Sequence, residues 1–384
     1  MGDHGGVAGV LNTFGPAYLA EHQISIGQAK VWRAITACRT AALGGQVESC
    51  NACHATRYVY HSCRNRHCPQ CQTRAKEAWI AARRHELLPV PYFHVVFTLP
   101  HDLNGLIARH ARLIYELILA ATSATLTEFA ANPRWLGGTP AFTLVLHTWK
   151  QDLGRHVHVH ALVAGGALTA TGAWVTAKRG FLFPVQALSK VFRAKFIAAL
   201  QVLRENGALD REAADAPSWR TLLAQLYAHD WVVYAKQPLG GPAQVLEYLG
   251  RYTHRVAISN ERIVRIDSDG VAFRVRASNE GNKRTLHLPG VEFIRRFLLH
   301  VLPKGFKRIR HYGLLGPAHK TAHLAAARAA LDAPAPDPAV IESVAAFMQR
   351  VTRIEWGRCP QCQLGHFKVV QAIPPVRHPP RGPP

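Results

Sequence analysis

The sequence predicts an α+β protein built on an antiparallel sheet, and three observations support this fold class. Runs rich in β-branched and aromatic residues, which are typical of strands, interleave with longer segments of helical periodicity. Two of these runs, 141–149 and 156–164, are separated by a short polar stretch containing Gly154, which predicts a β-hairpin. Hydrophobic residues make up 48% of the 384 residues and charged residues 18%, as in globular proteins. The length suits roughly two to three domains.

The first 90 residues divide into a helical segment and a cysteine-rich segment. Residues 1–37 form an N-terminal helical segment, which begins polar and Gly-rich and becomes helical over Ile26–Thr36. Residues 38–90 form an expected zinc-binding domain, because six of the eight cysteines lie in its first part. This domain ends with a predicted helix, Arg74–Leu88, which stops before Pro89.

Residues 91–320 carry the strands and helices of the expected sheet domain. Strands are predicted in four runs: Tyr92–Leu99, Ala141–Trp149, His156–Ala164 and Trp231–Ala235. Helices are predicted in four others: Asn104–Phe129, Pro184–Leu203, Gly241–Tyr252 and Val291–Leu299. Several short strands are predicted over Val256–Leu288, with a turn at Asp267–Gly270. Strands and helices that interleave with hairpins favour an α+β arrangement.

Residues 321–384 form an expected C-terminal extension. It contains a Pro-rich linker, Ala333–Ala339, and a tail from Pro374 whose composition is typical of disorder. No membrane span is expected, because the longest apolar stretch, Leu117–Thr127, is too short to cross a bilayer. The N-terminus also lacks the basic region of a signal peptide. We therefore expect a cytoplasmic protein whose thiols stay reduced.

The charge of the chain points to a polyanionic partner. There are 46 Lys and Arg residues against 24 Asp and Glu residues, so the net charge is +22 and the pI is about 10.2. A folded protein with this charge is typically a nucleic-acid binder. The alternative is a basic soluble enzyme, but +22 exceeds what solubility requires.

Four cysteines have the spacing of a structural zinc site. Cys50 and Cys53 form one C-x-x-C pair, and Cys68 and Cys71 form a second after fourteen intervening residues. Two such turns supply four thiolates to a tetrahedral Zn²⁺ and close its coordination shell. The alternative is a set of reduced, buried thiols.

Further donors lie near these pairs and in the C-terminal extension. Any of four nearby residues could replace a ligand or help to hold a second ion: Cys38, His61, Cys63 and His67. Cys359 and Cys362, with His366 beyond them, form a third C-x-x-C pair. This pair is only half a site, which binds zinc with a distant partner or not at all.

A histidine-rich strand predicts a second kind of metal site. His156, His158 and His160 alternate with valines, so a strand presents the three imidazoles on one face. His147 on the preceding strand and Gln151 in the turn lie within reach. Two or three imidazoles leave coordination positions open for substrate, as in catalytic sites. The alternative is an exposed histidine stripe, and the spacing does not distinguish Zn, Mn, Fe and Cu.

A helix with paired tyrosines follows. Tyr248 and Tyr252 are four residues apart and share one helix face, as do Arg251 and Arg255. Tyrosines at this spacing are often core residues, but the accompanying arginines suit phosphate. A tyrosine hydroxyl can attack a phosphodiester when a metal polarises the phosphoryl group.

The cysteine module, the H-V-H strand and the Y-x-x-x-Y helix stand in a characteristic order. In this order they resemble the rolling-circle, two-tyrosine transposases of the IS91 type, within the HUH endonuclease superfamily. The resemblance covers about residues 10–320. It is carried by CRTAALGG (38–45), SCRNRHCPQCQ (62–72), FHVVFTLPHDLN (93–104), LHTWKQDLGRHVHVHALVAGG (146–166), YLGRYTHRVAIS (248–259) and LPKGFKRIRHYGLLG (302–316).

The resemblance implies a fold and a set of site residues. The fold would be a ferredoxin/RRM-like antiparallel sheet, with the histidines on a central strand and the tyrosine helix beneath the metal. His158 and His160 would bind the catalytic ion, Mg²⁺ or Mn²⁺. The candidates for a third ligand are His147, His156 and Gln151, in that order. Tyr248 and Tyr252 would be the nucleophiles, and residues 91–320 the catalytic domain.

The implied activity is the cleavage and rejoining of single DNA strands at insertion-sequence ends through a 5′-phosphotyrosine. The partner would be single-stranded DNA at those ends, with the host replication machinery as a further candidate, in a bacterial, nucleoid-associated setting. Basic residues would hold neighbouring phosphates. They are Arg64, Arg66, Arg251, Arg255, Lys307, Arg308 and Arg310.

Three other functions remain open at this stage. A plasmid rolling-circle replication initiator or conjugative relaxase would use the same chemistry on different DNA ends. A zinc-dependent DNA-binding regulator would explain the charge and the cysteines without catalysis. A metallohydrolase would use the histidines to generate hydroxide, which leaves Tyr248 and Tyr252 without a role.

Overall fold

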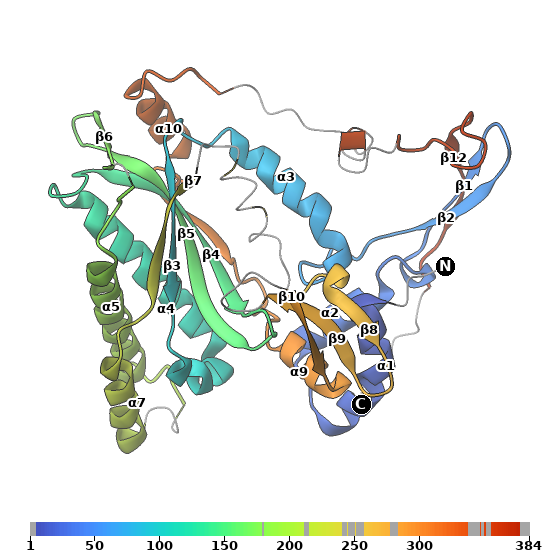
Figure 1. Cartoon of the computed structure of the whole chain (residues 1–384), viewed down its shortest axis with the longest axis horizontal. Coiled ribbons are helices and arrows are strands. Elements are labelled where there is room, and N and C mark those ends of the chain that lie inside the picture. The colour runs from blue at the N-terminus through green and yellow to red at the C-terminus, as the bar shows by residue number, and fades with distance from the viewer. Residues whose placement is uncertain are drawn as a thin grey trace. The chain divides into compact units, whose positions relative to one another are not determined.

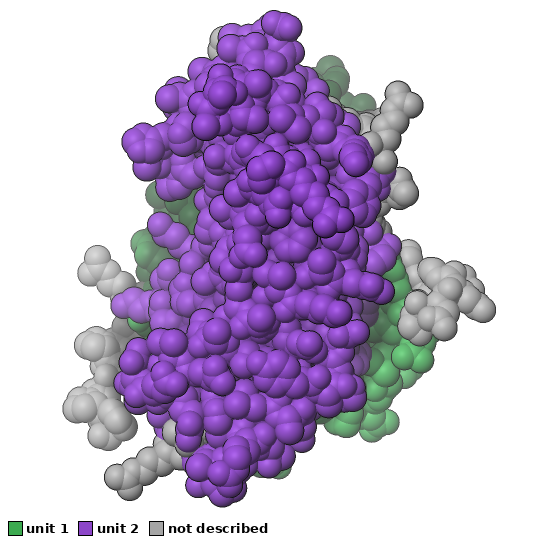
Figure 2. Space-filling view, turned by 90° about the vertical axis from the view of Figure 1, so that its left-hand side faces the viewer, with its two compact units in different colours: residues 1–77, 254–301, 339–384 green, residues 78–253, 302–338 purple. Residues whose placement is uncertain are grey.

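The computed structural model describes residues 5–178, 180–210, 215–239, 244, 250, 257–276, 283–336, 346, 349–350 and 355–376. The chain divides into two compact units (Figure 2). One comprises Met1–Glu77, His254–Val301 and Ala339–Pro384, and the other comprises Ala78–Thr253 and Leu302–Pro338. We call the first the terminal unit, since it contains both chain ends, and the second the sheet unit.

The sheet unit is built on an antiparallel sheet in which β5 is the middle strand (Figure 1). The strand order is β11-β4-β5-β3-β7, and β6 pairs with the last residues of β5. The strands are β3 (Tyr92–Thr98), β4 (Thr139–Trp149), β5 (Arg155–Leu168), β6 (Trp174–Thr176), β7 (Val233–Leu239) and β11 (Ile309–Gly313). The described pairs are all antiparallel, which confirms the predicted fold class.

One face of this sheet forms the main hydrophobic core. Successive strand residues point to opposite sides, so Val157 and Val159 of β5 point into this core. The core is completed by three helices: α4 (Asn104–Ala131), α5 (Val185–Glu205) and α7 (Ala216–Ala228). The intervening residues of β5 therefore lie on the other face.

Helix α4 is unusually apolar. Among the described residues, His101–Ala131 is the one helical stretch whose length and composition would allow it to cross a membrane, and 61% of its apolar window is buried inside the structure. Ile114, Ile118 and Leu126 of α4 belong to the main core. Packing of the core thus explains why α4 is apolar.

A smaller hydrophobic cluster covers one end of the opposite face. Leu162 and Ala164 of β5 belong to it, together with Leu324 and Ala327 of α10 (Lys320–Ala329). These β5 residues continue the alternation of His156, His158 and His160. The histidines therefore begin where this apolar cluster ends.

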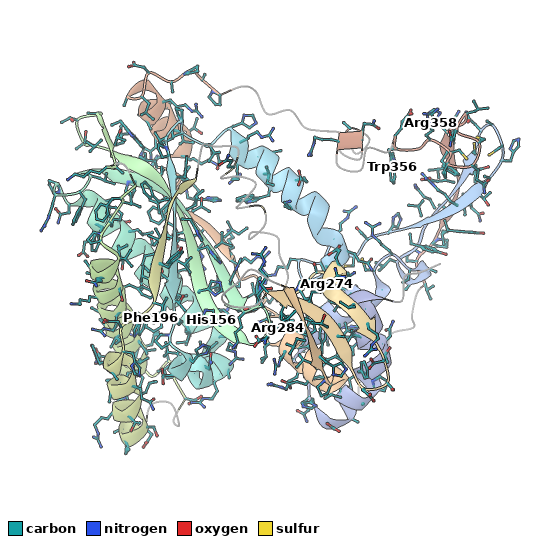
Figure 3. The ribbon with its side chains drawn as sticks, in the orientation of Figure 1. His156, Phe196, Arg274, Arg284, Trp356 and Arg358 are labelled. Carbon is teal, nitrogen blue, oxygen red and sulfur yellow. The ribbon has the colours of Figure 1, made fainter. Side chains whose placement is uncertain are left out.

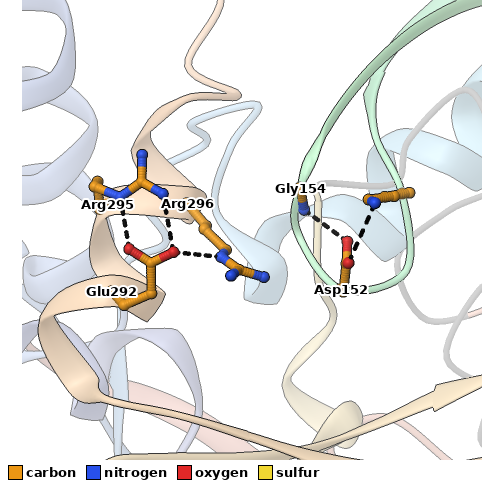
Figure 4. Close-up of polar contacts among 6 residues, drawn as sticks. Asp152, Gly154, Glu292, Arg295 and Arg296 are labelled. Carbon is orange, nitrogen blue, oxygen red and sulfur yellow. Dashed lines mark hydrogen bonds and ion pairs between the residues drawn. The ribbon is translucent and has the colours of Figure 1, made fainter. Parts of the chain in front are cut away.

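The terminal unit contains helices from distant parts of the chain. α1 (Gly6–Glu21) packs against α9 (Gly290–Leu298), and a Cβ at position 290 would collide with the ring of Phe14. Glu292 in the first turn of α9 accepts hydrogen bonds from Arg295 and Arg296 (Figure 4).

Two further helices flank the cysteine-rich segment. α2 (Ile26–Ala37) begins with a capping box formed by Ser25 and Gln28 and ends at Cys38. α3 (Gln72–Arg84) begins directly after a 3₁₀ turn, Pro69–Cys71. Its start belongs to the terminal unit and its later turns to the sheet unit.

Two small antiparallel sheets complete the terminal unit. One has the order β10-β9-β8, with β8 (Ile263–Ile266), β9 (Val271–Arg276) and β10 (Lys283–Leu288). The other has the order β12-β1-β2, with β1 (Gly45–Cys50), β2 (Thr56–Tyr60) and β12 (Phe367–Ile373). The second sheet joins a C-terminal strand to two N-terminal strands.

The division into units differs from the four sequential segments predicted. Residues 254–301 were expected within the 91–320 domain but belong to the terminal unit, because α9 packs on α1. The C-terminal extension does not stand apart, because β12 pairs with β1. The expected tyrosine helix lies outside the described residues except for Gln244 and Gly250, which are helical, and the tail beyond residue 376 also lies outside them.

Candidate metal centres

Three histidines of the sheet unit come together on its central strands. His147 lies on β4, and His158 and His160 lie on β5. His147 and His158 are direct cross-strand partners, and His160 follows two residues further on the same face. A ring nitrogen of each histidine lies within 4.8 Å of those of the other two. We call these three residues the histidine cluster.

The hairpin between β4 and β5 holds this cluster in register. In its turn the carboxylate of Asp152 accepts a hydrogen bond from the backbone N–H of Gly154 at 2.8 Å (Figure 4). The same carboxylate lies 3.5 Å from the ammonium group of Lys150. Because a closed turn fixes strand register, it keeps His147 opposite His158.

A hydrogen bond of His158 decides which of its nitrogens can bind a metal. Nδ1 lies 2.9 Å from the backbone carbonyl oxygen of His156. A carbonyl oxygen only accepts, so Nδ1 carries the proton and Nε2 keeps its lone pair. Metal-ligating histidines in proteins are commonly oriented in this way, through the second ring nitrogen.

His158 and His160 are uncharged at neutral pH. Burial is the main cause that lowers the pKa of His158 to about 4, and the positive charge that His156 can carry acts in the same direction. Burial, followed by the charges of His147 and His158, holds the pKa of His160 well below its usual value. Neutral imidazole is the form that binds metal ions, so burial keeps both rings ready for coordination.

A fourth histidine, His94 of β3, supports the cluster from the neighbouring strand. Its Nε2 lies 2.8 Å from Nδ1 of His160, and both side chains are buried. If Nε2 of His160 binds a metal, Nδ1 of His160 must be the donor in this contact. The sequence did not single out His94. The available signal was one histidine in an otherwise apolar strand next to the histidine-rich one.

The other predicted ligands are not among the three residues whose ring nitrogens all lie within 4.8 Å of one another. His156 lies at the hairpin end of β5 (Figure 3), and its ring centre is 5.1 Å from that of His158. Its buried Nδ1 has no hydrogen-bond partner among the described residues. Gln151 is exposed in the turn. Of the third ligands considered, the structure therefore brings His147 to His158 and His160.

The three imidazoles fit a divalent metal ion. They are close together, two of them are neutral, and the lone pair of at least one is directed by a backbone hydrogen bond. Nitrogen donors suit Mn²⁺ and later transition metals better than Mg²⁺, which prefers oxygen. Three protein ligands leave coordination positions for substrate oxygens.

Four cysteines of the terminal unit, which we call the local cluster, lie close together in sequence and in space. They are Cys38, Cys63, Cys68 and Cys71. The sulfur of Cys71 lies 3.5 Å from that of Cys38 and 3.6 Å from that of Cys63. Hydrogen bonds from the thiols of Cys63 and Cys68 lower the pKa of Cys38. This cluster connects the end of α2 to the start of α3.

Four other cysteines, which we call the end-joining cluster, come from opposite ends of the chain. They are Cys50, Cys53, Cys359 and Cys362. The sulfurs of Cys50 and Cys362 are 3.7 Å apart, and those of Cys53 and Cys359 are 3.6 Å apart. Backbone N–H groups of Gly365 and Leu364 lower the pKa of Cys362 to about 6.

This grouping corrects the one predicted from the sequence. Cys50 and Cys53 do not share a site with Cys68 and Cys71, because each pair meets different partners. The physical reason is strand pairing. β1 ends at Cys50 and pairs with β12, which brings the C-terminal cysteines to this turn instead.

Both cysteine clusters fit Zn²⁺. A tetrahedral ion with sulfur ligands at about 2.3 Å places those sulfurs about 3.8 Å apart. The observed separations of 3.5 to 3.7 Å are close to this spacing. Four thiolates close the coordination shell, so such an ion would stabilise structure.

The predicted nucleophiles and two of the predicted DNA contacts lie outside the described residues. These are Tyr248, Tyr252, Arg251 and Arg255. In the sequence they come after β7, which pairs with β3 in the sheet that carries the histidine cluster.

The remaining predicted DNA contacts differ in exposure. Lys307 is exposed just before β11, and Arg308 is half-buried. The guanidinium group of Arg310 lies 2.7 Å from the carboxylate of Glu116. In the terminal unit Arg64 is exposed and Arg66 is half-buried. Arg64 and Lys307 are therefore the most accessible, whereas Arg310 already has a carboxylate partner.

Two models of transposase families match the chain. Residues 10–99 match a model described as "Transposase zinc-binding domain", and residues 141–322 match a model described as "Putative transposase". The local cluster lies in the first match and the histidine cluster in the second. Cys359 and Cys362 lie outside both.

Whole proteins with the same description are also similar. A "Putative transposase y4qJ" from Sinorhizobium fredii is 42% identical over 386 residues, which cover 98% of this chain and 97% of that protein. A "Transposase for insertion sequence element IS801" from Pseudomonas savastanoi pv. phaseolicola is 26% identical over 291 residues, covering 73% and 68% of the two chains. No solved structure matches the chain.

Proposed function

The chain belongs to the transposase family of IS91-type insertion sequences, and we propose that it cuts and rejoins single DNA strands at the ends of its element. Family membership makes it a DNA-processing transposase with a zinc-binding domain. Beyond this, we propose the type of strand that it cuts, the nucleophile and the metal centre.

The observation that carries this proposal is the histidine cluster. A DNA-binding protein needs no group of neutral imidazoles on the central strands of a sheet. The ring nitrogens of His147, His158 and His160 lie close enough together to bind one metal ion, and such an ion would give this grouping a common role. When bound there, the ion would act as a Lewis acid on the scissile phosphate.

The protein side chains would divide the remaining work among themselves. His158, with its proton held on Nδ1 by the carbonyl of His156, presents Nε2 to the ion. His94 holds the ring of His160 through its contact of 2.8 Å. The nucleophile would be the hydroxyl of Tyr248 or Tyr252.

The proposed strand transfer conserves bonds. The tyrosine oxygen forms a bond to phosphorus while the bond from phosphorus to the 3′-oxygen breaks, and the phenolic proton passes in net terms to the 3′-oxygen. The products are a 5′-phosphotyrosine and a free 3′-hydroxyl. Rejoining reverses these steps without ATP. A second tyrosine allows a second cut while the first strand end is still held.

Basic side chains in both units would hold the DNA. Exposed Lys307 and Arg64 are the most accessible of the described candidates, and Arg251 and Arg255 would act next to the nucleophiles. With a net charge of +22 the chain has the electrostatic character of a nucleic-acid binder. We place the protein in the bacterial cytoplasm, associated with the nucleoid, with the host replication machinery as a candidate partner.

The other functions considered from the sequence fit less well. A non-catalytic zinc regulator leaves the histidine cluster without a purpose. A replication initiator or relaxase would share the chemistry, but the matched models and relatives are described as transposases. A metallohydrolase would leave no covalent adduct with DNA, so one experiment separates it from the proposal.

That experiment is a covalent-adduct assay. The purified chain is mixed with labelled single-stranded DNA from the ends flanking its own gene, with Mn²⁺ or Mg²⁺, and run on a denaturing gel. We expect a metal-dependent, protein-linked DNA band. The band should vanish in the Tyr248→Phe/Tyr252→Phe double variant, and the single variants rank the two nucleophiles.

Tyr234→Phe is the matched control, because Tyr234 is an exposed tyrosine on β7 outside the Y-x-x-x-Y pair. It should form the adduct at the wild-type rate. An adduct that persists in the double variant would contradict the assignment of the nucleophiles. Specific DNA binding without an adduct, with both metals and several ends, would contradict the proposed chemistry.

A further inference from the structure

The cysteines at the two ends of the chain meet in one place. Cys50 and Cys53 lie at the end of β1 and in the following turn, whereas Cys359 and Cys362 lie shortly before β12. We propose that these four thiols hold a second structural zinc ion, distinct from that of the local cluster, which fastens the C-terminal segment to the N-terminal sheet.

The distances favour a shared ion. All four sulfurs lie within 4.8 Å of one another, although more than three hundred residues separate the two pairs. The closest contacts between the two pairs, at 3.6 and 3.7 Å, are far longer than the roughly 2.05 Å of a disulfide bond. They are close to the roughly 3.8 Å that a tetrahedral thiolate site requires.

Each cysteine pair forms the same kind of turn. The backbone N–H of His54 donates to the carbonyl of Cys50 at 3.1 Å, and that of Gln363 donates to the carbonyl of Cys359 at 2.9 Å. His54 and Gln363, which directly follow the second cysteine of each pair, both have positive φ angles of 59° and 56°. Two equivalent turns facing one another are typical of structural zinc sites built from C-x-x-C pairs.

Backbone amides also point at the sulfurs. The N–H of Ala52 donates to the sulfur of Cys50 at 3.4 Å, and the N–H of Gly365 donates to the sulfur of Cys362 at 3.4 Å. Such bonds favour a thiolate over a thiol, and the thiolate is the metal-binding form. Position 365 also needs glycine, because a Cβ there would lie 2.5 Å from the sulfur of Cys50.

The surrounding contacts hold the two ends together at this point. β1 and β12 are paired so that Cys50 lies opposite Phe367. Asn51 binds His366 twice, since its N–H donates to the carbonyl of His366 at 3.1 Å and its side-chain oxygen accepts the N–H of His366 at 2.8 Å.

Charged and aromatic contacts continue this attachment along the sheet. Arg57 of β2 forms an ion pair with Glu48 of β1 at 2.6 Å, and its guanidinium lies 4.0 Å from the ring centre of Phe367. Trp356, in the segment before β12 (Figure 3), lies 5.5 Å from the same guanidinium. The sulfurs are thus brought together by a docked segment.

The end-joining cluster extends beyond the matched zinc-binding domain. That match covers residues 10–99, so it contains the local cluster but only half of the end-joining cluster. A zinc ion bound by Cys50 and Cys53 alone would have an incomplete shell. The C-terminal cysteines would complete it, which gives the extension a structural purpose.

The test is the zinc content of the full chain, measured by mass spectrometry of the metal after gel filtration. We expect two equivalents in the wild type and one in the Cys359→Ser/Cys362→Ser double variant. The Cys50→Ser/Cys53→Ser variant should also retain one, because the local cluster is separate. His366→Ala is the matched control, since His366 contacts Glu355 at 3.1 Å and is not in the cluster, and it should retain two equivalents.

A second measurement needs no variant. In the wild type, N-ethylmaleimide should modify Cys359 and Cys362 only after a chelator has removed the zinc, and cobalt(II) should then restore protection and give thiolate-to-cobalt absorption. One zinc equivalent in the wild type would overturn the proposal. So would two equivalents in the Cys359→Ser/Cys362→Ser variant, or modification of both thiols without loss of zinc.

Discussion

The histidine cluster and the two cysteine clusters offer metal ions very different surroundings. The first presents three imidazole nitrogens from paired strands in the sheet unit, and the others present four sulfurs each in the terminal unit. Imidazole ligands carry no charge, so an ion held by three of them keeps its positive charge and has open coordination positions for a substrate. Four thiolates neutralise the charge of the ion and fill its coordination shell. We infer that the number and charge of the donors distinguish the proposed catalytic metal site from the two structural sites of the same chain.

Removing one donor should therefore lower adduct formation at the histidine cluster, but lower zinc content and stability at a cysteine cluster. The largest effect is expected for His158→Ala, because it removes the nitrogen whose lone pair is directed by the carbonyl of His156. Adduct formation should fall by at least about 10³-fold, while zinc content and DNA binding change little. Initial rates of adduct formation measure the effect. His229→Ala, at an exposed position outside the cluster, is the control. Equal losses of binding and cleavage would count against a catalytic role.

In the local cluster, by contrast, loss of one ligand should lower the zinc content and the melting temperature. Cys68→Ser removes a fully buried sulfur that helps to join α2 to α3, so the variant should lose one zinc equivalent and melt about 10 °C or more below the wild type. Calorimetry and metal analysis test this. A variant that keeps its zinc and its melting temperature would show that Cys68 is not a ligand.

His94 should affect metal binding indirectly, because it contacts the proposed ligand His160 and not the metal itself. His94→Ala removes the contact of 2.8 Å to His160 and should raise the Mn²⁺ concentration needed for half-maximal adduct formation by about 10- to 100-fold. His94→Gln keeps a hydrogen-bonding group near that position and should recover part of the loss. If both variants lower the maximal rate without changing the Mn²⁺ requirement, His94 does not position a metal ligand.

The smallest effect is expected for His311, a half-buried histidine of the same sheet that is not part of the histidine cluster. Arg83 can only donate to Nε2 of His311, at 3.1 Å, so Nδ1 of His311 donates to the hydroxyl of Thr143 at 2.9 Å. Burial, with the charge of Arg83, lowers the pKa of His311 to about 4.

Because of this lowered pKa, the stability of the folded chain should depend on pH in a definite direction. The unfolded chain takes up a proton on His311 below about pH 6.5, whereas the folded chain does so only near pH 4. Stability should therefore fall as the pH drops through this window. His311→Gln should lose less melting temperature between pH 7 and pH 5 than the wild type, by about 2–4 °C. Parallel pH profiles for the two proteins would refute this.

The strand alternation made the histidine cluster predictable. His158 and His160 share one face of the strand because they alternate with valines that point into the core. The hairpin around Gly154 brings His147 opposite His158. The predicted helices and strands of the sheet unit follow the same periodic patterns, and most of them agree with the structure to within a few residues.

The cysteine grouping could not be predicted in the same way. A C-x-x-C pair shows that two sulfurs form a turn, but the partner turn is chosen by tertiary structure. Here the choice depends on the pairing of β1 with β12, a contact between residues more than three hundred positions apart. His94 was missed because its role depends on which strand lies beside β5. Helix α1 was missed because its sequence is Gly-rich and it is held by packing on α9.

The most direct test of the histidine cluster as the working metal centre is Mn²⁺ binding to the zinc-loaded full chain. Titration calorimetry of the wild type and of the His147→Ala/His158→Ala/His160→Ala variant, with zinc measured in the same samples, gives the answer. We expect one Mn²⁺ per wild-type chain, none in the variant, and two zinc equivalents in both. Equal Mn²⁺ binding by the two proteins would contradict this assignment.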